Sequence, residues 1–206
     1  MDIVLNTNFN NPNLPIVPVP GFYDDFTSGG GGYETLGVTH DNKPWDYMGG
    51  LGWFQRADGT ATGAGLLDGV NRSSLAVVNG VHSDGTLVAK IALESTSDLR
   101  YGIALRVTDS RNYLHVSQSS NAAWLRIYKV VDNQSTVVAQ VSDQTLATGD
   151  ILQARFSGPQ INVLLNNTLV LSGLSDHNMN ATHHGFFNWS TGEYIANPRW
   201  DWIRFE

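Results

Sequence analysis

The body of the chain is a succession of short apolar segments separated by polar turns. From residue 60 onward these segments include SSLAVVNG, TLVAKIALES, RYGIALRVTD, AWLRIYKVVD and QINVLLNNTLVLSG. Each is rich in β-branched, leucine or aromatic residues, and turn-forming sequences such as DNQ and SGP lie between them. Short segments at a spacing of about ten residues, without a sustained helical period, predict an antiparallel β-sandwich or barrel.

Several segments alternate between aliphatic and other side chains, which divides each predicted strand into two faces. In YGIALRV, for example, Ile103 and Leu105 share one face and Arg106 lies on the other. Because successive side chains of a strand point to opposite sides, we expect one face to serve the core and the second to hold polar and aromatic groups. The residues of this second face are Arg106, Tyr113, His115, Trp124, Arg126 and Tyr128.

Four tryptophans are expected in the core. Trp45 and Trp53 lie among glycines in DNKPWDYMGGLGWF, and the closing segment RWDWIRFE carries Trp200 and Trp202. Strict alternation places Trp200, Trp202 and Arg204 on one face of that segment. The sequence therefore predicts aromatic anchors near both ends of the body.

A different pattern opens the chain. Residues 1–21 are rich in asparagine and proline, and Pro12, Pro15 and Pro18 recur every third position, which is the period of a polyproline II helix. We therefore divide the chain into an extended N-terminal docking arm, residues 1–21, and a sandwich domain, residues 22–206. The positions expected to contact a docking partner are Ile3, Val4, Leu5, Pro15, Ile16, Val17, Pro18, Val19, Pro20 and Phe22.

The net charge of the chain indicates which classes of binding partner to expect. The formal net charge is −7, and the acidic residues are scattered. Nucleic acids and anionic membranes attract clustered lysine and arginine, so neither is expected as a partner. The start, MDIVLNTNFN, lacks the basic and apolar regions of a signal peptide. We expect the protein to be made in a host cytoplasm without such a signal.

The order of several segments along residues 22–206 resembles a known kind of domain. FYDDF is followed by DNKPW, GGLGWFQRADGTA, YGIALRVTDSRNYLHV, LRIYKVVDNQSTVVAQ, GDILQARFSGPQINVLLNNTLVL, HHGFF and WDWIRF. This order is similar to that of concanavalin A-like, laminin G-like jelly-roll domains in minor tail and other virion proteins of phages that infect actinobacteria. The resemblance implies a two-sheet antiparallel sandwich in which residues 22–26 lie beside residues 200–205.

Jelly-roll relatives include glucanases, so glycoside hydrolysis is the first catalytic activity to consider. A retaining glycosidase needs two carboxyl groups about 5–5.5 Å apart, which on one strand means acidic residues at positions i and i+2. No acidic residue of this chain has another at i+2, and the neighbours Asp24 and Asp25 would point to opposite faces. A Gly-x-Ser-x-Gly nucleophile motif is also missing. We therefore expect a protein without enzymatic activity.

Metal binding has one candidate set. Asp24, Asp25 and Asp201 would meet if the first and last strands pair, and Ca²⁺ prefers carboxylate and carbonyl oxygens. The alternative is that these aspartates accept hydrogen bonds from turn amides or pair with Arg199 or Arg204. Relatives of this fold often hold a structural calcium ion, and otherwise no cofactor is expected.

The remaining histidines and the lack of cysteine do not favour zinc. The chain has no cysteine, so it has no thiolate ligand and no disulfide. His177, His183 and His184 are close in sequence, but adjacent residues diverge on a strand. We interpret these three as surface or turn histidines.

The second face of the predicted sheet has the composition of a sugar-binding surface, which combines aromatic rings with planar polar groups. It could equally be a plain sheet face, since aromatic residues also pair across strands for stability, or be covered by a neighbouring subunit. The preferred hypothesis is a structural virion protein (a minor tail, capsid decoration or fibre protein) that docks on other virion proteins, forms a homo-oligomer there, and adheres to host-surface glycan. The alternatives are a free lectin or carbohydrate-binding module and, third, a glycan depolymerase.

Overall fold

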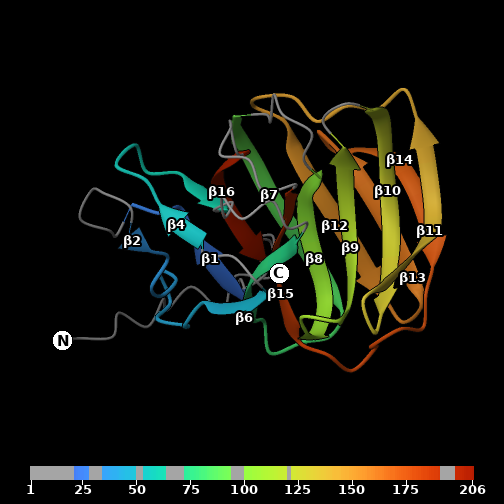
Figure 1. Cartoon of the computed structure of the whole chain (residues 1–206), viewed down its shortest axis with the longest axis horizontal. Coiled ribbons are helices and arrows are strands. Elements are labelled where there is room, and N and C mark those ends of the chain that lie inside the picture. Colours follow the sequence, from blue (N-terminus) through green and yellow to red (C-terminus); the bar gives the residue numbers. More distant parts are fainter. Residues whose placement is uncertain are drawn as a thin grey trace, which may run out of the picture.

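Two antiparallel β-sheets lie face to face in the computed structural model (Figure 1). The structure describes residues 21–27, 34–49, 53–63, 72–93, 100–119, 122–190 and 198–206. Every regular element within these ranges is a strand, which confirms the predicted two-sheet antiparallel sandwich. The described part contains no helix that is long and apolar enough to cross a membrane. Residues 1–20 of the predicted arm lie outside the described ranges, so their docking role stays a prediction.

One sheet has nine strands and includes both ends of the sandwich domain. Its path is β14 (Thr168–Leu174), β13 (Gln160–Leu165), β12 (Ile151–Ser157), β7 (Gly85–Leu93), β16 (Arg199–Phe205), β5 (Ala61–Gly63), β4 (Trp53–Gln55) and β2 (Glu34–Thr35). The ninth strand, β1 (Phe22–Asp24), pairs with β16 beside this path.

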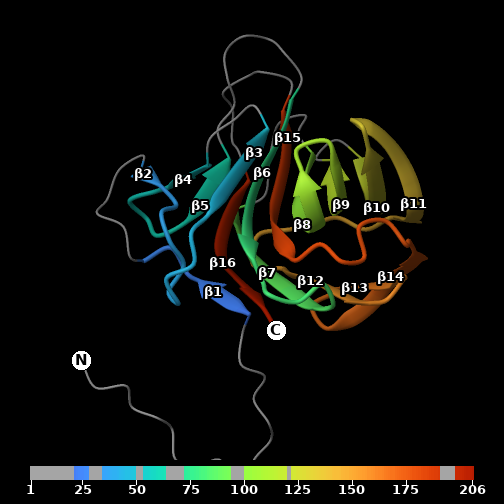
Figure 2. The ribbon, with the colours of Figure 1, turned by 90° about the horizontal axis from the view of Figure 1, so that it is seen from below.

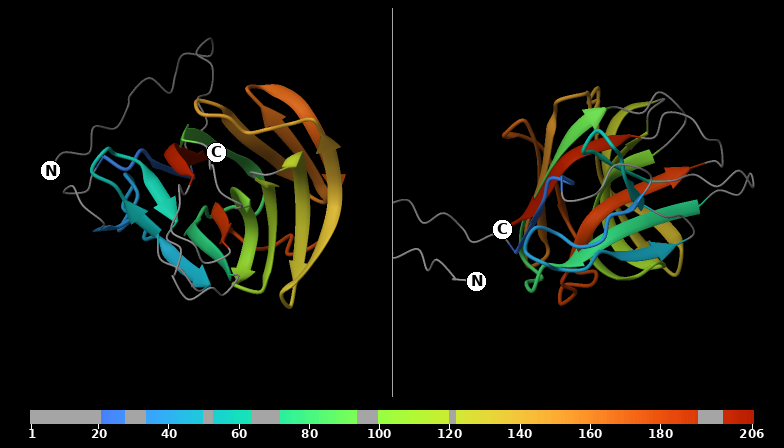
Figure 3. Two further views of the ribbon diagram at one scale, coloured as in Figure 1. Left: turned by 45° about the horizontal axis from the view of Figure 1, so that its top comes forward. Right: turned by 90° about the vertical axis from the view of Figure 1, so that its left-hand side faces the viewer.

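The second sheet has seven strands and carries the predicted aromatic face. Its order is β11 (Gln134–Ser142), β10 (Ala122–Val131), β9 (Asn112–Ser119), β8 (Arg100–Asp109), β15 (His183–Ser190), β6 (Arg72–Asn79) and β3 (Asp46–Gly49). Figure 2 shows the two layers edge-on, with β8 to β11 over β12 to β14. Figure 3 shows them from two further sides, with the C-terminus at the end of β16. The inner faces of the two sheets enclose the main core.

The first and last strands pair as the resemblance implies. Phe22 lies opposite Phe205, and Asp24 lies opposite Ile203. The Gly21 amide continues this ladder by donating to the Phe205 carbonyl. A Cβ atom on Gly21 would lie 2.5 Å from the Phe205 ring, so the chain enters the sandwich at a position that has no room for a side chain.

Phe22 does not belong to the docking surface, and this corrects one sequence-based prediction. Its side chain is fully buried, with ring contacts to Trp45 and Phe205 whose centroids are 6.1 Å away in each case. The prediction failed because Phe22 follows directly on the apolar arm in sequence. The pairing of β1 with β16 turns its side chain into the core.

The core confirms three of the four predicted tryptophans and corrects the fourth. Trp45, Trp53 and Trp200 are buried, whereas Trp202 is only half-buried. The register of β16 against β7 shifts between Trp200 and Trp202. Such a bulge adds one residue and reverses the alternation that follows it, so Ile203 takes the core position after it and Trp202 turns outward.

Candidate functional site

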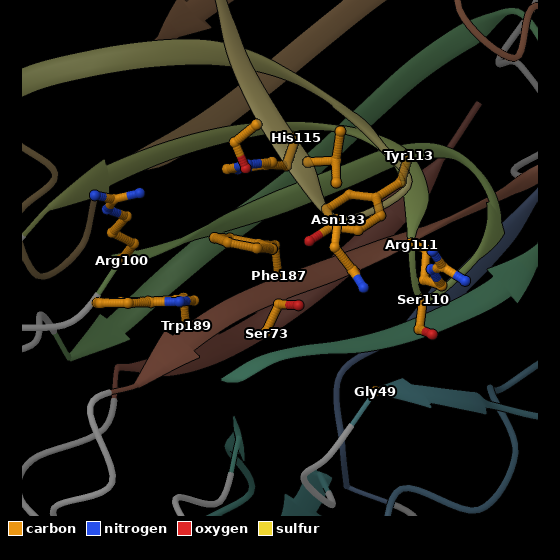
Figure 4. A pocket seen from close by; sticks show the side chains of 12 residues that line it. Gly49, Ser73, Arg100, Ser110, Arg111, Tyr113, His115, Asn133, Phe187 and Trp189 are labelled. Atoms are coloured by element: carbon orange, nitrogen blue, oxygen red, sulfur yellow. The ribbon is translucent and has the colours of Figure 1, made fainter. Parts of the chain in front are cut away.

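An elongated hollow of about 530 Å³ lies on the outer face of the seven-stranded sheet (Figure 4). Its lining includes Arg100 at the start of β8 and Ser110 and Arg111 just after the end of that strand. Strands on both sides also contribute, with His115 from β9 and Trp189 from β15. The hollow is therefore formed by neighbouring strands of one sheet, not by a single motif.

The floor of the hollow is a stack of aromatic rings. The His115 ring lies 3.9 Å from that of Phe187, at an interplanar angle of 22°, and 4.7 Å from that of Tyr128, at 9°. Tyr113 extends the stack, with its ring 6.1 Å from Phe187. These residues face the same way because each lies on the outward position of its own strand, opposite the core residues. The cross-strand contacts fix the floor in one arrangement.

His115 is a neutral group within this stack. It is 2% exposed, and its Nδ1 atom has no hydrogen-bond partner among the described residues. Burial, with the nearby positive charge of Arg100, lowers the pKa of His115 to about 3. The imidazole therefore carries no charge at neutral pH, and the positive charge at this end of the hollow belongs to Arg100.

Arg100 lies at one end of the hollow against aromatic faces. Its guanidinium carbon is 5.0 Å from the ring centroid of Trp189 and 5.9 Å from that of Tyr128. A guanidinium over an aromatic face is attracted by the negative π-system of the ring. At the other end, Arg111 pairs with Asp132 at 3.4 Å. Hydroxyl and amide groups complete the lining, among them those of Ser73, Ser110, Ser135 and Asn133.

Trp124 and Arg126 form a separate cluster on β10. The Arg126 guanidinium carbon lies 3.8 Å from the Trp124 ring centroid, and its Nη1 donates to the Tyr128 hydroxyl at 3.0 Å. Its Nε donates to Gln140 of β11. Of the six predicted site residues, Tyr113 and His115 line the hollow, Tyr128 supports its floor, and Trp124 and Arg126 lie beside it on the same strand as Tyr128.

Arg106 does not belong to this face, which corrects the sequence-based prediction. Its side chain is fully buried and donates to the Ser83 carbonyl at 3.2 Å, the Gly158 carbonyl at 2.6 Å and the Asp84 carboxylate at 2.8 Å. The residue has a positive φ of 49°, and the β8–β9 register shifts after Leu105. The irregularity reverses the alternation of β8 at this point, so Arg106 turns away from the outer face.

No carboxylate occurs among the described residues that line the hollow. The aspartates near it, such as Asp132, lie in the surrounding turns, and Asp132 is already paired with Arg111. The two closely spaced carboxyl groups of a retaining glycosidase are therefore not found in the described lining. What this lining offers a ligand is apolar surface, hydroxyls, an amide and guanidinium groups.

The predicted calcium ligands do not assemble as expected. Asp201 is bound to Lys90 at 2.6 Å, and the group that does come together is Asp24, Asp25 and His40, with ligand atoms within 4.8 Å of one another. The Asp24 oxygens accept hydrogen bonds from the Trp45 indole, at 2.7 Å, and from a backbone amide. Burial raises the pKa of Asp24 despite these bonds. Two occupied carboxylates and an imidazole are a poor match for the all-oxygen shell of Ca²⁺, and calcium binding stays a prediction.

The three clustered histidines have different environments. His177 and His183 are half-buried, and His183 lies 3.6 Å from Asp46. His184 is fully buried, which corrects its interpretation as a surface residue. Its ring accepts a hydrogen bond from the Arg106 amide at 3.1 Å and contacts the His82 carbonyl at 3.0 Å. The two adjacent histidines diverge on their strand, as the alternation predicts, and their rings lie in different environments.

Sequence reasoning missed Arg100, Phe187 and Trp189. The alternation of HHGFFNWS places Phe187 and Trp189 on one face, and the same rule places Arg100 with Gly102 and Ala104. This signal was present in the sequence. The pairing of β8 with β15, which sets Arg100 opposite Trp189, joins segments far apart in the chain and could not be inferred from local pattern.

Comparison with known proteins gives the fold and no family. No protein-family model and no curated protein matches the sequence. Carbohydrate binding module CBM66 from Bacillus subtilis superposes with a TM-score of 0.56 at 13% identity, over 79% of this chain and 91% of that chain. A β-glucanase from Bacillus licheniformis gives 0.54 at 11% identity, over 89% and 96%. The fold is a jelly roll of this concanavalin A-like type.

A third solved structure is similar by the same measures. A protein of unknown function from Shewanella oneidensis gives a TM-score of 0.59 at 14% identity, over 89% of this chain and 84% of that chain. Identities this low establish a shared jelly roll and leave the activity of this chain to be argued from its own residues.

Proposed function

We propose that this protein binds glycan in the hollow of the seven-stranded sheet and has no enzymatic activity. The observation that carries the proposal is the lining itself, which combines a preformed aromatic floor with hydroxyl, amide and guanidinium groups and has no carboxylate among its described residues. The fold is consistent with it, since the similar structures include a carbohydrate-binding module and a glucanase.

The chemistry of the lining suits a sugar chain. The C–H faces of a pyranose pack on apolar and aromatic surface, and its hydroxyls bond to a few well-placed polar groups. Because His115 is already held between Phe187 and Tyr128, little side-chain freedom is lost when a ligand binds. The hollow runs along β8, so it suits a chain of several sugars better than a single one.

The blocking variant Ser73→Trp tests this proposal. Ser73 lines the hollow from β6, so an indole there fills the space that a sugar would take. On a glycan array we expect specific binding by the native protein, and titration of the bound glycan should show affinity reduced about tenfold or more in the variant, a loss of at least 1.4 kcal/mol.

The matched control is Ser157→Trp, which adds the same side chain at an exposed position of β12 on the other sheet. It should bind as the native protein does, and circular dichroism should show both variants folded. A blank array, or equal binding by both variants, contradicts the proposal. Release of new reducing ends from a bound polysaccharide would show a depolymerase instead.

We further propose that the protein acts on a virion, docked there by residues 1–21. The proposal is supported by the resemblance of the segment order to that of virion jelly rolls and by the proline period of the arm, whose polyproline bias lowers the entropy lost on docking. Deleting residues 1–20 should leave a folded, glycan-binding domain that is absent from purified particles, as measured by mass spectrometry. Normal incorporation of the truncated protein would contradict docking by the arm without bearing on glycan binding.

A further inference from the structure

Five arginine side chains within the described part of the chain contact a carboxylate. Contacts of this kind hold Arg56 and Arg199 at Asp58, Arg106 at Asp84, Arg111 at Asp132 and Arg204 at Glu206. Arg126 instead donates hydrogen bonds to Gln140 and Tyr128. The side-chain contacts of Arg100, the arginine at one end of the hollow, can be compared with these.

Arg100 has contacts of a different kind. Within the described part of the chain, no hydrogen bond or ion pair joins it to another side chain, and its guanidinium lies over the rings of Trp189 and Tyr128. These contacts with ring faces use no hydrogen-bond acceptor, so within the described residues the N–H donors of the guanidinium have no side-chain acceptor. Figure 4 shows Arg100 beside Trp189 at one end of the hollow, with Arg111 at the other.

The charge of the residues that line the hollow differs in sign from the net charge of the whole chain. The chain as a whole carries a formal charge of −7, which disfavours the approach of anions. The described lining of the hollow nevertheless contains two arginines, of which Arg111 is paired with Asp132, and no acidic residue. A half-buried guanidinium at the edge of an apolar floor is less well hydrated than one in open solvent, so its interaction with an anion is less screened.

We propose that the hollow selects an acidic saccharide, and that Arg100 binds its carboxylate or sulfate group. The planar guanidinium presents two parallel N–H donors to such a group, a geometry that gives both strength and direction. Trp189 and Tyr128 hold the guanidinium in place, and the neutral floor beside them receives the apolar face of the sugar ring. This inference rests on the proposed glycan-binding function and adds the chemical class of the glycan.

Paired polymers that differ only in charge test the inference. Polygalacturonate is compared with its methyl ester, and dextran sulfate with dextran, by affinity electrophoresis and calorimetric titration of the full chain. The native protein should bind at least one acidic polymer about tenfold or more tightly than its neutral counterpart, as expected for a hydrogen bond to a charged group. The pair that shows the preference distinguishes a carboxylate from a sulfate.

Four variants locate the effect. Arg100→Gln should remove the preference, and Arg100→Lys should keep only part of it, because lysine retains the charge but not the planar pair of donors. Arg155→Gln, which removes the same charge from an exposed position of β12 on the other sheet, should leave the preference unchanged. Ser73→Trp should abolish binding of the acidic polymer. That loss would show that the polymer binds in the hollow and not elsewhere on the protein surface.

The experiments distinguish failure of the acidic-saccharide inference from failure of the proposed glycan-binding function. Equal binding of acidic and neutral polymers, acidic preference that persists in Arg100→Gln, or acidic binding that persists in Ser73→Trp overturns the inference. A neutral glycan that binds in the hollow overturns it as well but leaves the proposed function standing. Absence of binding to every polymer and to the glycan array overturns both.

Discussion

Replacing Phe186 by alanine is expected to lower the free energy of unfolding by about 3–5 kcal/mol, the usual cost of removing a large buried aromatic side chain. Phe186 is fully buried on the inner side of β15. Its ring centroid lies 5.6 Å from that of Trp45, 5.2 Å from Trp53 and 5.1 Å from Trp200. It is thus the common neighbour of the three core tryptophans, and its loss leaves a cavity lined by these indole rings.

Urea denaturation followed by tryptophan fluorescence measures this effect. Phe186→Leu is the matched control and should cost clearly less, because it keeps most of the apolar contact. Met179→Ala, at a side chain that is 38% exposed, should change stability by no more than about 0.5 kcal/mol. An unfolding free energy of Phe186→Ala within 1 kcal/mol of the native value, taken as roughly the floor for a core truncation, would contradict the described core.

Arg106→Met is expected to destabilise the protein by about 2–4 kcal/mol without weakening glycan binding by the folded molecules. The substitution keeps an apolar stem but removes the donors to the Ser83 and Gly158 carbonyls and the partner of Asp84. Asp84 is 47% exposed, so its charge can be solvated after the loss. The cost therefore comes chiefly from the two carbonyls and from the packing of the guanidinium on Phe156.

Two measurements on this variant separate a structural role from a ligand-binding one. The denaturation midpoint should fall, while the affinity at a temperature where the protein is folded stays at the native value. Arg155→Met, at an exposed arginine on β12, should change neither. If Arg106→Met has native stability but has lost glycan affinity, Arg106 belongs to the binding site. That result would contradict its buried position against Phe156.

The limits of prediction from sequence are clear in these residues. Alternation in YGIALRV is enough to assign Ile103 and Leu105 to the core, because an undisturbed strand has a strict period of two. In HHGFFNWS the same alternation separates Phe186 from Phe187 but does not say which of them faces the core. It fails after the irregularities at Arg106 and between Trp200 and Trp202. A bulge has no strong sequence signal when its residue is not glycine, and one extra residue moves every later side chain to the other face.

The candidate site was predictable only in part for a related reason. The composition of β9 and β10 indicated Tyr113, His115 and Tyr128, which lie on consecutive strands joined by a short turn. Arg100 and Trp189 meet only because β15 inserts between β6 and β8, a long-range pairing that depends on the whole topology. The residues that we regard as most important for ligand selection thus come from the part of the fold that local pattern cannot supply.

The central claim is that a glycan binds along β8 in the hollow of the seven-stranded sheet. Its most direct test is a nuclear magnetic resonance titration of the ¹⁵N-labelled protein with the glycan that the array identifies, following side-chain N–H signals. We predict that the signals of Arg100 and Trp189 shift and saturate together, while those of Arg155 and Trp202 on the other sheet stay in place. Shifts confined to Arg155 and Trp202, or no shift at saturating glycan, would contradict the account.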